Sequence, residues 1–474
     1  MNIMFQFSTK ILRGFLCLML NLLLGSVYSG QCSVHGDYLT RGDHHDSPLI
    51  LTPLIDHGET KQAKKLSEVD PSLFAGVNSH AAYITVDKLR KWNLFFWYFP
   101  AQGVDLESTP LIIWLQGGPG ASSLFGLFQE IGPLQIVNGS VQVANTRWGS
   151  NYSLLFIDNP VGTGFSFSEG GKYVTNQNQV GRCLLKFIQQ FLQVFPELRK
   201  APLFIAGESY AGKYIPAFGH HIHHSKDTTI NLRGLMIGSG WIDPPTMMHY
   251  SEWALQVGLL DHKQAEDLNK LESDARWNWK NGNISAYTEN ALKAMTMFYT
   301  IVPVNVYNYM NGEPADFPSP VESPLETFLN KAEVQKALHV KKKFYEFNQI
   351  VFDWLRSDEF RTVKQWLEEL VEHYGVMCYN GQLDLVVPYA LSVRTYRSLQ
   401  WSGRQGYLDA PRQFIYDEEN SSRINSFVKS SGNFMEAMVI GAGHLVSTDQ
   451  PRAAKQIIDM FINIHKYLPQ NDLV

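Results

Sequence analysis

Short apolar runs, separated by longer amphipathic stretches, dominate the middle of the chain. Six runs are rich in the aromatic and β-branched residues that favour strands, and they span residues 93–99, 111–115, 154–157, 203–206, 232–237 and 376–379. Between 180 and 195, apolar residues recur every three to four positions, which predicts an amphipathic helix that ends at Pro196. Buried strands alternating with such helices predict an α/β fold with a largely parallel sheet covered on both faces.

One region interrupts this alternation. From 241 to 324 the pattern predicts helices, at 261–273 and 289–299 among others, but no strand. Prolines at 318, 320 and 324 indicate a linker at its end. We therefore expect a helical cap inserted at 241–324, which divides an α/β core into a first part, 30–240, and a second part, 325–474.

The N-terminal residues have the pattern of a targeting segment. Lys10 and Arg13 precede an apolar run at 15–24, and small residues follow at 25–29. The run is too short to span a bilayer comfortably, which favours a secretory signal peptide at 1–29 over a membrane anchor. No later stretch reaches transmembrane length. The sequence therefore predicts a secretory-pathway protein, either secreted or lysosomal/endosomal.

Composition narrows the functional classes. Of 474 residues, 45% are hydrophobic and 18% charged, which is typical of a globular protein with a sizeable core. The formal net charge of −5 suggests no basic face, so nucleic-acid binding is not expected. Four N-x-S/T motifs predict glycosylation, at Asn138, Asn151, Asn283 and Asn420.

Cysteine is scarce for a secreted protein. Cys17 would leave with the signal peptide, so Cys32, Cys183 and Cys378 remain. Three thiols cannot form a disulfide framework, and at least one must stay unpaired. The sequence leaves their pairing open and indicates that stability comes from the core.

The first chemical motif follows the strand at 203–206. Residues 207–212 read GESYAG, the frame of a nucleophile elbow with one extra alanine before the last glycine. Small neighbours are needed there because the serine backbone is strained and its hydroxyl must stand clear of the sheet. The motif predicts Ser209 as a nucleophile, and the alternative is a tight strand–helix turn with an idle serine.

Two further motifs supply the partners that such a serine needs. Asp384 follows the strand at 376–379, and His444 lies in a glycine-rich loop at 441–445. Alone, each could be an ordinary turn or loop residue. The chain order Ser, Asp, His is that of α/β hydrolases, in which histidine is the general base and the carboxylate orients it.

A glycine-rich loop follows the strand at 111–115. Gly117 and Gly118 could present backbone N–H groups to an oxyanion, as the equivalent loop does in other hydrolases. The alternative is a simple glycine-rich turn.

Taken together, these segments resemble the serine carboxypeptidase family. The motifs are WLQGGPG, SSLFGLFQEIGP, DNPVGTGFSFS, GESYAGKY, NGQLD and GAGHLVSTDQP, which occur in this order within residues 80–470. The chain looks most like the vitellogenic carboxypeptidase-like branch. The resemblance implies an α/β-hydrolase fold with a central mixed, mostly parallel sheet and an inserted helical cap. It also implies removal of single C-terminal residues from peptides, through an acyl-enzyme and under acidic conditions.

The resemblance assigns a role to each matching residue. The catalytic residues would be Ser209, Asp384 and His444, and the oxyanion hole would be the backbone N–H groups of Gly118 and Tyr210. The substrate's terminal carboxylate would be bound by Gln116, Gly117, Glu130 and Glu208. At Gln116 the family has asparagine, one carbon shorter. The leaving residue would lie against Phe125 and Leu445.

Other functions remain open. An acyltransferase or esterase could use the same triad, and a catalytically silent storage or binding protein is the alternative of another class. We expect a peptide or protein substrate with a free C-terminus, no cofactor, no metal, no nucleic acid and no stable membrane insertion; the resemblance also allows a homodimer. Four histidines at helical spacing could suggest zinc, but we expect a solvated helix face because no carboxylate or cysteine completes a set. They are His220, His221, His223 and His224.

Overall fold

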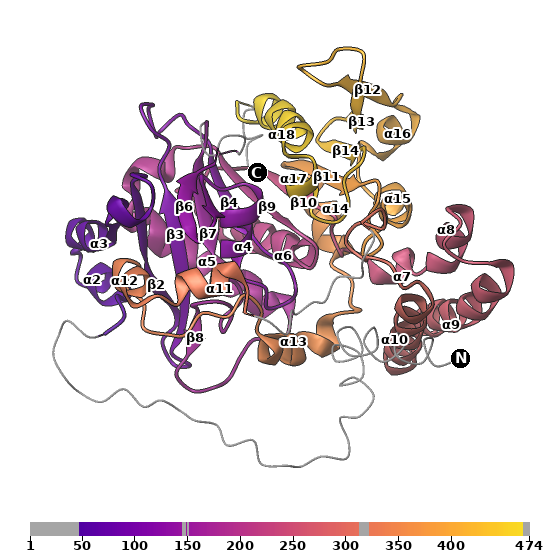
Figure 1. The fold of residues 1–474 in the computed structure, drawn as a ribbon, viewed down its shortest axis with the longest axis horizontal. Coiled ribbons are helices and arrows are strands. Elements are labelled where there is room, and N and C mark those ends of the chain that lie inside the picture. Colours follow the sequence, from indigo (N-terminus) through magenta and orange to yellow (C-terminus); the bar gives the residue numbers. More distant parts are fainter. Residues whose placement is uncertain (1–46, 145–147, 149–150, 312–321, 468–474) are drawn as a thin grey trace. The chain divides into compact units, whose positions relative to one another are not determined.

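The computed structural model describes residues 47–144, 148, 151–311 and 322–467 (Figure 1). Their contacts divide the chain into two compact units. The described part of the smaller unit is mainly Met248–Val306, and the larger unit, which includes Leu49–Met247 and Ser323 onward, holds the sheet. None of the helices in these ranges is both long and apolar enough to cross a membrane.

The larger unit is built on a 12-stranded sheet. Along the sheet the strands follow the order β1-β2-β3-β7-β4-β9-β10-β11-β14-β13-β12, with β8 paired to β3. Strands β5 and β6 form a separate hairpin. The strands are β1 (Glu68–Val69), β2 (Ser79–Asp87), β3 (Trp92–Phe99), β4 (Leu111–Leu115), β5 (Leu134–Val137), β6 (Ser140–Val143), β7 (Ser153–Ile157), β8 (Phe167–Ser168), β9 (Leu203–Glu208), β10 (Leu232–Gly238), β11 (Gly375–Gly381), β12 (Gln413–Tyr416), β13 (Ile424–Ser431) and β14 (Phe434–Val439).

Helices surround the sheet and form the smaller unit. They are α2 (Thr52–Asp56), α3 (Thr60–Leu66), α4 (Ser123–Phe125), α5 (Gln177–Val194), α6 (Ala211–Ser225), α7 (Pro244–Met247), α8 (Tyr250–Gln256), α9 (His262–Lys280), α10 (Ile284–Ile301), α11 (Pro324–Leu329), α12 (Ala332–Ala337), α13 (Gln349–Leu355), α14 (Lys364–Val371), α15 (Tyr389–Ser398), α16 (Arg404–Asp409), α17 (Val446–Asp449) and α18 (Pro451–His465). A short π-helical turn, η2, spans Gly126–Glu130.

The centre of the sheet is parallel and its edges are antiparallel. Strands β7, β4, β9, β10, β11 and β14 run in one direction, and the strands beyond them pair antiparallel. All six predicted strands are confirmed, five of them in this parallel centre. Parallel strands end at the same edge, so the loops after these strands are brought together there.

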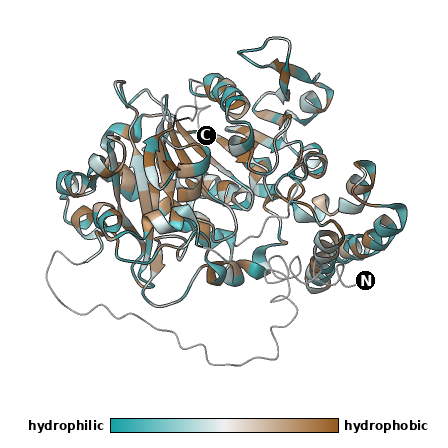
Figure 2. Ribbon diagram, in the orientation of Figure 1, coloured by the Kyte–Doolittle hydropathy of each residue, from teal (hydrophilic) through white to brown (hydrophobic). Residues whose placement is uncertain are grey.

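Both faces of the parallel strands are covered, as the continuous apolar runs predict. On β10, a Cβ at Gly234 would lie 3.0 Å from Phe204 and from Phe461 of α18. The next residue, Leu235, points to the opposite face, where it meets Gly219 of α6. Figure 2 shows the resulting pattern, with apolar strands enclosed by helices whose outer faces are polar. This two-sided burial confirms the predicted α/β architecture.

The smaller unit is helical throughout its described residues. Helices α9 and α10 pack along each other, and α8 packs on α9. Asp261 and Gln264 form a capping box at the start of α9. No strand occurs in residues 241–311 or 322–324, so the prediction of a helical region is confirmed, while the boundaries 241–324 stay a prediction.

A buried carboxylate fastens the start of α8 within this unit. Glu272 of α9 is fully buried and accepts hydrogen bonds from the backbone N–H groups of Tyr250 and Ser251, at 2.5 and 3.2 Å, and from the Ser251 hydroxyl. These N–H groups lie in the first turn of α8, where backbone N–H groups have no acceptor inside their own helix. Burial raises the pKa of Glu272, whereas the Ser251 and Tyr250 donors lower it.

Candidate active site

Ser209 lies on a sharp turn between β9 and α6. Its backbone φ is +61°, in the left-handed region that a non-glycine residue rarely adopts. The Ser209 N–H donates to Gly238 O at 2.9 Å, and Ser209 O accepts from the N–H groups of Trp241 and Gly212, each at 2.9 Å. The surrounding backbone therefore holds this strained conformation in place, as the elbow motif predicts.

Close backbone contacts explain the glycines on both sides of Ser209. A Cβ at Gly207 would lie 2.1 Å from the carbonyl oxygen of Leu115, on the neighbouring strand. A Cβ at Gly212 would lie 2.7 Å from the backbone nitrogen of Trp241. Both neighbours are backbone atoms that cannot move aside, so only glycine fits at either position.

His444 and Asp384 are paired in a fully enclosed position. His444 Nδ1 lies 2.8 Å from Asp384 Oδ2, with 2% of His444 and none of Asp384 exposed. The other oxygen, Asp384 Oδ1, accepts from the backbone N–H groups of Val386 and Val387 at 2.7 and 3.0 Å. The carboxylate is therefore fixed from two sides and can orient the imidazole.

The parallel sheet brings four candidate residues, together with Ser239, to one edge. Each follows the carboxyl end of a different strand among β4, β9, β10, β11 and β14, which are consecutive neighbours in the sheet. In that order they are Gln116, Ser209, Ser239, Asp384 and His444. This edge is where ligands bind in open α/β sheets.

The loop after β10 connects the serine turn to the histidine loop. Gly238 accepts from the N–H of Ser209, and the hydroxyl of the next residue, Ser239, donates to the carbonyl oxygen of His444 at 3.0 Å. The N–H of His444 donates to Tyr307 O at 2.6 Å. Within the described residues, Ser209 Oγ makes no hydrogen bond to His444, so the two loops are tied together by other groups.

Gln116 joins two buried glutamates beside the serine turn. Gln116 Oε1 accepts from the Trp114 indole at 2.8 Å, which directs the amide nitrogen the other way. That nitrogen donates to Glu208 Oε1 at 2.8 Å and to Glu130 Oε1 at 3.1 Å. The exposed fractions are 5% for Gln116, 2% for Glu208 and 1% for Glu130. Because its side chain is one carbon longer than that of asparagine, Gln116 reaches both carboxyl groups with its amide nitrogen.

The two glutamates cannot both carry full charge at low cost. Burial raises the pKa of Glu208 well above its usual range, and the charge of Glu130 and a hydrogen bond between the two carboxyl groups raise it further. The Gln116 amide opposes this by lowering the pKa of Glu208. A hydrogen bond between carboxyl groups needs one proton, so the pair holds at least one at acidic pH.

The glycine loop after β4 lies against the serine turn. A Cβ at Gly117 would lie 2.7 Å from the backbone nitrogen of Tyr210 and 2.8 Å from Ser209 Cβ. Gly118 has a φ of +107°. In the described part of the chain, neither the N–H of Gly118 nor that of Tyr210 donates to another protein group. Both donors therefore remain available beside Ser209.

Phe125 and Leu445 lie in two segments that adjoin. Phe125 ends α4 and Leu445 precedes α17, and both side chains are half-buried. Thr448 of α17 donates its hydroxyl to Gln129 O of η2 at 3.2 Å, which joins the two segments. The structure thus brings these segments together, while the leaving-residue pocket stays a prediction.

A buried network behind the Ser209 turn is not predicted by the sequence. Lys213 is fully buried and donates to the carbonyl oxygens of Asp358 and Glu359 at 2.5 and 2.6 Å. Burial lowers the pKa of Lys213 to about 8. The Tyr210 hydroxyl donates to the Asp358 carboxylate at 3.1 Å. The network therefore anchors Tyr210. The only sign of this network in the sequence is that an apolar helix carries a lysine.

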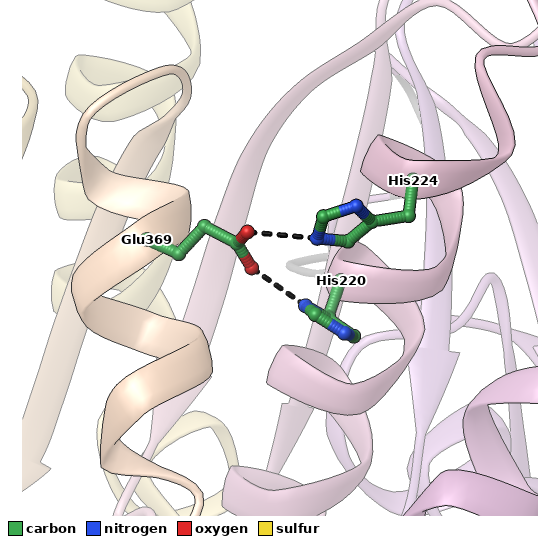
Figure 3. A group of neighbouring side chains, drawn as sticks. All are labelled: His220, His224 and Glu369. Atoms are coloured by element: carbon green, nitrogen blue, oxygen red, sulfur yellow. Dashed lines mark hydrogen bonds and ion pairs between the residues drawn. The ribbon is translucent and has the colours of Figure 1, made fainter.

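The expectation for the histidine cluster is wrong in one respect. A carboxylate does complete a set, because Glu369 of α14 contacts both His220 and His224 of α6 (Figure 3). Glu369 lies far along the chain, so no local spacing revealed it.

Two of the predicted thiols and all four glycosylation motifs lie within the described residues. Cys183 and Cys378 are free and buried, and burial raises the pKa of the Cys183 thiol to about 12. Cys32 and the predicted signal peptide lie outside the described residues. All four motif asparagines are exposed.

Comparison with known proteins identifies the family. Residues 71–464 match the family model described as "Serine carboxypeptidase". The chain belongs to the serine carboxypeptidase family. It is 38% identical over 433 residues to the human probable serine carboxypeptidase CPVL, which covers 88% of this chain and 89% of that protein. The vitellogenic carboxypeptidase of Aedes aegypti is also 38% identical over 433 residues, with 87% and 89% covered. The resemblance to this branch is thus confirmed.

A solved carboxypeptidase has the same fold. The crystal structure of Kex1(delta)p, a prohormone-processing carboxypeptidase from Saccharomyces cerevisiae, matches with a TM-score of 0.77 at 25% identity. The match covers 85% of this chain and 96% of that one. The α/β-hydrolase fold is therefore confirmed, and the chain is a hydrolase of the serine carboxypeptidase class, whose substrates are peptides.

Proposed function

We propose that Ser209, His444 and Asp384 form the catalytic triad of this carboxypeptidase. His444 takes the Ser209 proton while Oγ attacks the scissile carbonyl, and the leaving amino acid departs with that proton as the acyl-enzyme forms. Water, activated by His444, then releases the shortened peptide. The 2.8 Å hydrogen bond between His444 Nδ1 and Asp384 supports the assignment. Because the proton of the imidazole is then held on Nδ1, Nε2 is the nitrogen that can accept the Ser209 proton.

The free N–H groups of Gly118 and Tyr210 are proposed to stabilise the oxyanion. Both belong to segments in contact with Ser209, and neither is used elsewhere in the described structure. Backbone donors fixed in advance stabilise the negative charge that develops on the carbonyl oxygen. The Lys213–Asp358 network holds the Tyr210 side chain and so supports this position.

The carboxyl pair beside Ser209 carries the proposal of an exopeptidase. Gln116 and the protonated forms of Glu208 and Glu130 would donate hydrogen bonds to the terminal carboxylate of the peptide, with Gly117 beside them against the serine turn. A peptide without that carboxylate has nothing to place there. Buried groups that seek one specific partner reject analogues that lack it.

The same pair supports activity in acid. The pKa of Glu208 is raised well above its usual range by burial and by Glu130. Below the raised value the site is protonated and attracts the substrate carboxylate, and above it the site becomes anionic and repels it. We therefore expect substrate binding to weaken as the pH rises toward neutral.

A paired-substrate digestion tests the proposal. Two peptides of identical sequence, one with a free C-terminal acid and one amidated, are incubated with the protein at pH 5 and analysed by mass spectrometry. We expect stepwise loss of single residues from the acid only, and no loss with Ser209→Ala. Internal cleavage of both peptides would overturn the exopeptidase assignment. Ester turnover without peptide cleavage would indicate an esterase or acyltransferase, and no fluorophosphonate adduct on Ser209 would indicate a silent binding protein.

We also propose that the protein enters the secretory pathway and is glycosylated, then secreted or sent to lysosomes. The four motif asparagines are all exposed, and Asn138 lies at the tip of the β5–β6 hairpin. Treatment with an N-glycan-removing enzyme should lower the mass of protein from an animal-cell medium or lysate. An unchanged mass, with the residues 1–29 still present, would contradict this proposal.

A further inference from the structure

Two histidines of α6 and one glutamate of α14 converge away from the candidate active site (Figure 3). His220 Nδ1 lies 2.6 Å from Glu369 Oε2, and His224 Nε2 lies 2.7 Å from Glu369 Oε1. One possible ligand atom from each side chain lies within 4.8 Å of the other two. The two imidazole nitrogens thus both face one carboxylate, and the three groups lie close enough together to share one ion.

The helix geometry makes this convergence rigid. His220 and His224 are four residues apart, so they project from the same face of α6 one turn from each other. Beside them the helices approach closely, because a Cβ at Gly219 would lie 3.0 Å from Leu370 of α14. The ring of His220 also stacks on Trp366 of α14, with centroids 5.1 Å apart and planes at 21°. Packing therefore sets the ring of His220 and the spacing of the helices.

The cluster has the ligands and the access that a zinc ion requires. Zinc in proteins takes imidazole and carboxylate ligands at about 2.0–2.2 Å, which places tetrahedral ligand atoms roughly 3.3 Å apart. The present contacts of 2.6 and 2.7 Å would need to widen only slightly. Exposed fractions of 26% for His220, 55% for His224 and 30% for Glu369 leave an open side for entry and for a water as fourth ligand.

We propose that His220, His224 and Glu369 bind one Zn²⁺ ion that cross-links α6 to α14. Two imidazole nitrogens disfavour Mg²⁺ and Ca²⁺, which prefer oxygen ligands. Helix α6 begins directly after the Ser209 turn, and α14 precedes β11. The ion would therefore brace the two helices next to the strands of the active site, and it takes no part in the chemistry.

Calorimetric titration of the full chain tests the site directly. Protein freed of metal by a chelator and dialysed at pH 7.5 is titrated with ZnCl₂ and, separately, with MgCl₂. We expect one zinc per chain whose binding is lost or weakened at least about tenfold in His224→Gln and in Glu369→Gln, and no magnesium binding. Mutation of a residue that only hydrogen-bonds to a metal ligand typically lowers metal affinity about 10- to 100-fold. Loss of a ligand itself should lower the affinity at least as much.

His223→Gln is the matched control. His223 is on the same helix but stacks on His373 at 4.6 Å and contacts the Tyr374 hydroxyl, not Glu369. The control should keep wild-type zinc affinity within about twofold. The thermal midpoint should rise with zinc in wild type and control, and not in the two ligand variants. No zinc binding by wild type, or binding that the ligand variants retain, would overturn the proposal.

Cobalt substitution gives a readout that does not depend on any variant. Co²⁺ bound by two imidazoles, a carboxylate and water should produce the intense visible absorption of a four-coordinate ion, and zinc should abolish it by competition. Only the weak absorption of hydrated, six-coordinate cobalt would contradict the site, even if a variant failed to fold.

Discussion

Two buried glutamates, Glu208 and Glu272, show how the same side chain can serve different ends. Both have raised pKa values because of burial. Glu272 is surrounded by donors, namely the first N–H groups of α8 and the Ser251 hydroxyl. Glu208 instead faces a second carboxyl group, Glu130, with one amide between them. The carboxylate of Glu272 is satisfied by its own protein, which indicates a structural role, whereas the carboxyl group of Glu208 is short of donors, which supports its proposed role in binding a ligand.

The difference predicts opposite costs of removal. Loss of a satisfied acid leaves buried donors unpaired and destabilises the fold. Loss of an acid from a like-charged pair relieves repulsion and should cost function instead of stability.

The largest effect is expected at the nucleophile. Ser209→Ala should lower kcat/KM for a free-acid peptide on the order of 10⁴-fold or more, since nucleophile and base act as a unit. Its stability should stay equal to or above that of wild type, because Oγ has no hydrogen-bond partner among the residues that the structure describes. Steady-state kinetics and urea unfolding of the same preparation check both halves. Substantial peptidase activity in pure protein would refute the nucleophile.

Removal of the structural acid should give the reverse result. Glu272→Ala leaves the N–H groups of Tyr250 and Ser251 without their acceptor, which should destabilise by about 1–3 kcal/mol. Hydrogen exchange at residues 250–256 should speed up, measured by mass spectrometry. Glu266→Ala, on the exposed side of α9, is the control and should change stability by less than about 0.5 kcal/mol. Equal loss in both variants would contradict the capping role.

The paired acids should reveal themselves through pH. In wild type, KM for a free-acid peptide should rise with pH when measured from pH 4 to pH 8, because the raised pKa of Glu208 keeps the pair protonated in acid, and the ionised pair repels the substrate carboxylate. The double variant Glu208→Gln and Glu130→Gln keeps hydrogen-bond donors and cannot ionise. Its activity at acid pH should be lower, but its KM profile should be flatter. Parallel profiles would remove the pair from the mechanism.

The smallest effect is expected for Gln116→Asn. Shortening the side chain by about 1.5 Å withdraws the amide from at least one of the two carboxyl groups, which stand 2.8 and 3.1 Å away. KM should increase roughly fivefold, as expected for about 1 kcal/mol of hydrogen bonding, with kcat nearly unchanged. An unchanged KM would mean that the pocket adapts to the shorter residue.

Buried parallel strands were predictable because their sequence is a continuous apolar run. β4 reads LIIWL and lies wholly in the core. Strand β14 lies in the same parallel set but was missed, because Glu436 interrupts its apolar run. That carboxyl is buried and accepts hydrogen bonds from the hydroxyls of Tyr389 and Tyr407. Because these partners lie outside the strand, the sequence of the strand alone cannot reveal them.

The candidate site and its surroundings likewise contain residues that a local pattern predicts and residues that it does not. Ser209, Asp384 and His444 could be proposed from the sequence because each stands in a local motif. Ser209 and Asp384 follow predicted strands, and His444 lies in a glycine-rich loop. Glu369 is 149 residues from His220, and Lys213 is 145 residues from Asp358. Such pairs arise only from the packing of helices, which leaves no spacing to detect.

The order of the strands has a consequence for biosynthesis. Ser209 follows β9, whereas His444 follows β14, which takes its place beside β11 near the end of the chain. A nascent chain that has emerged only through β10 already carries the nucleophile but has neither its base nor its acid. With the triad assigned as above, the ribosome-bound chain is therefore inert, and hydrolytic activity begins only when the last strands are added. The connectivity of the sheet thus makes the proposed triad one of the last features of the fold to be completed during synthesis.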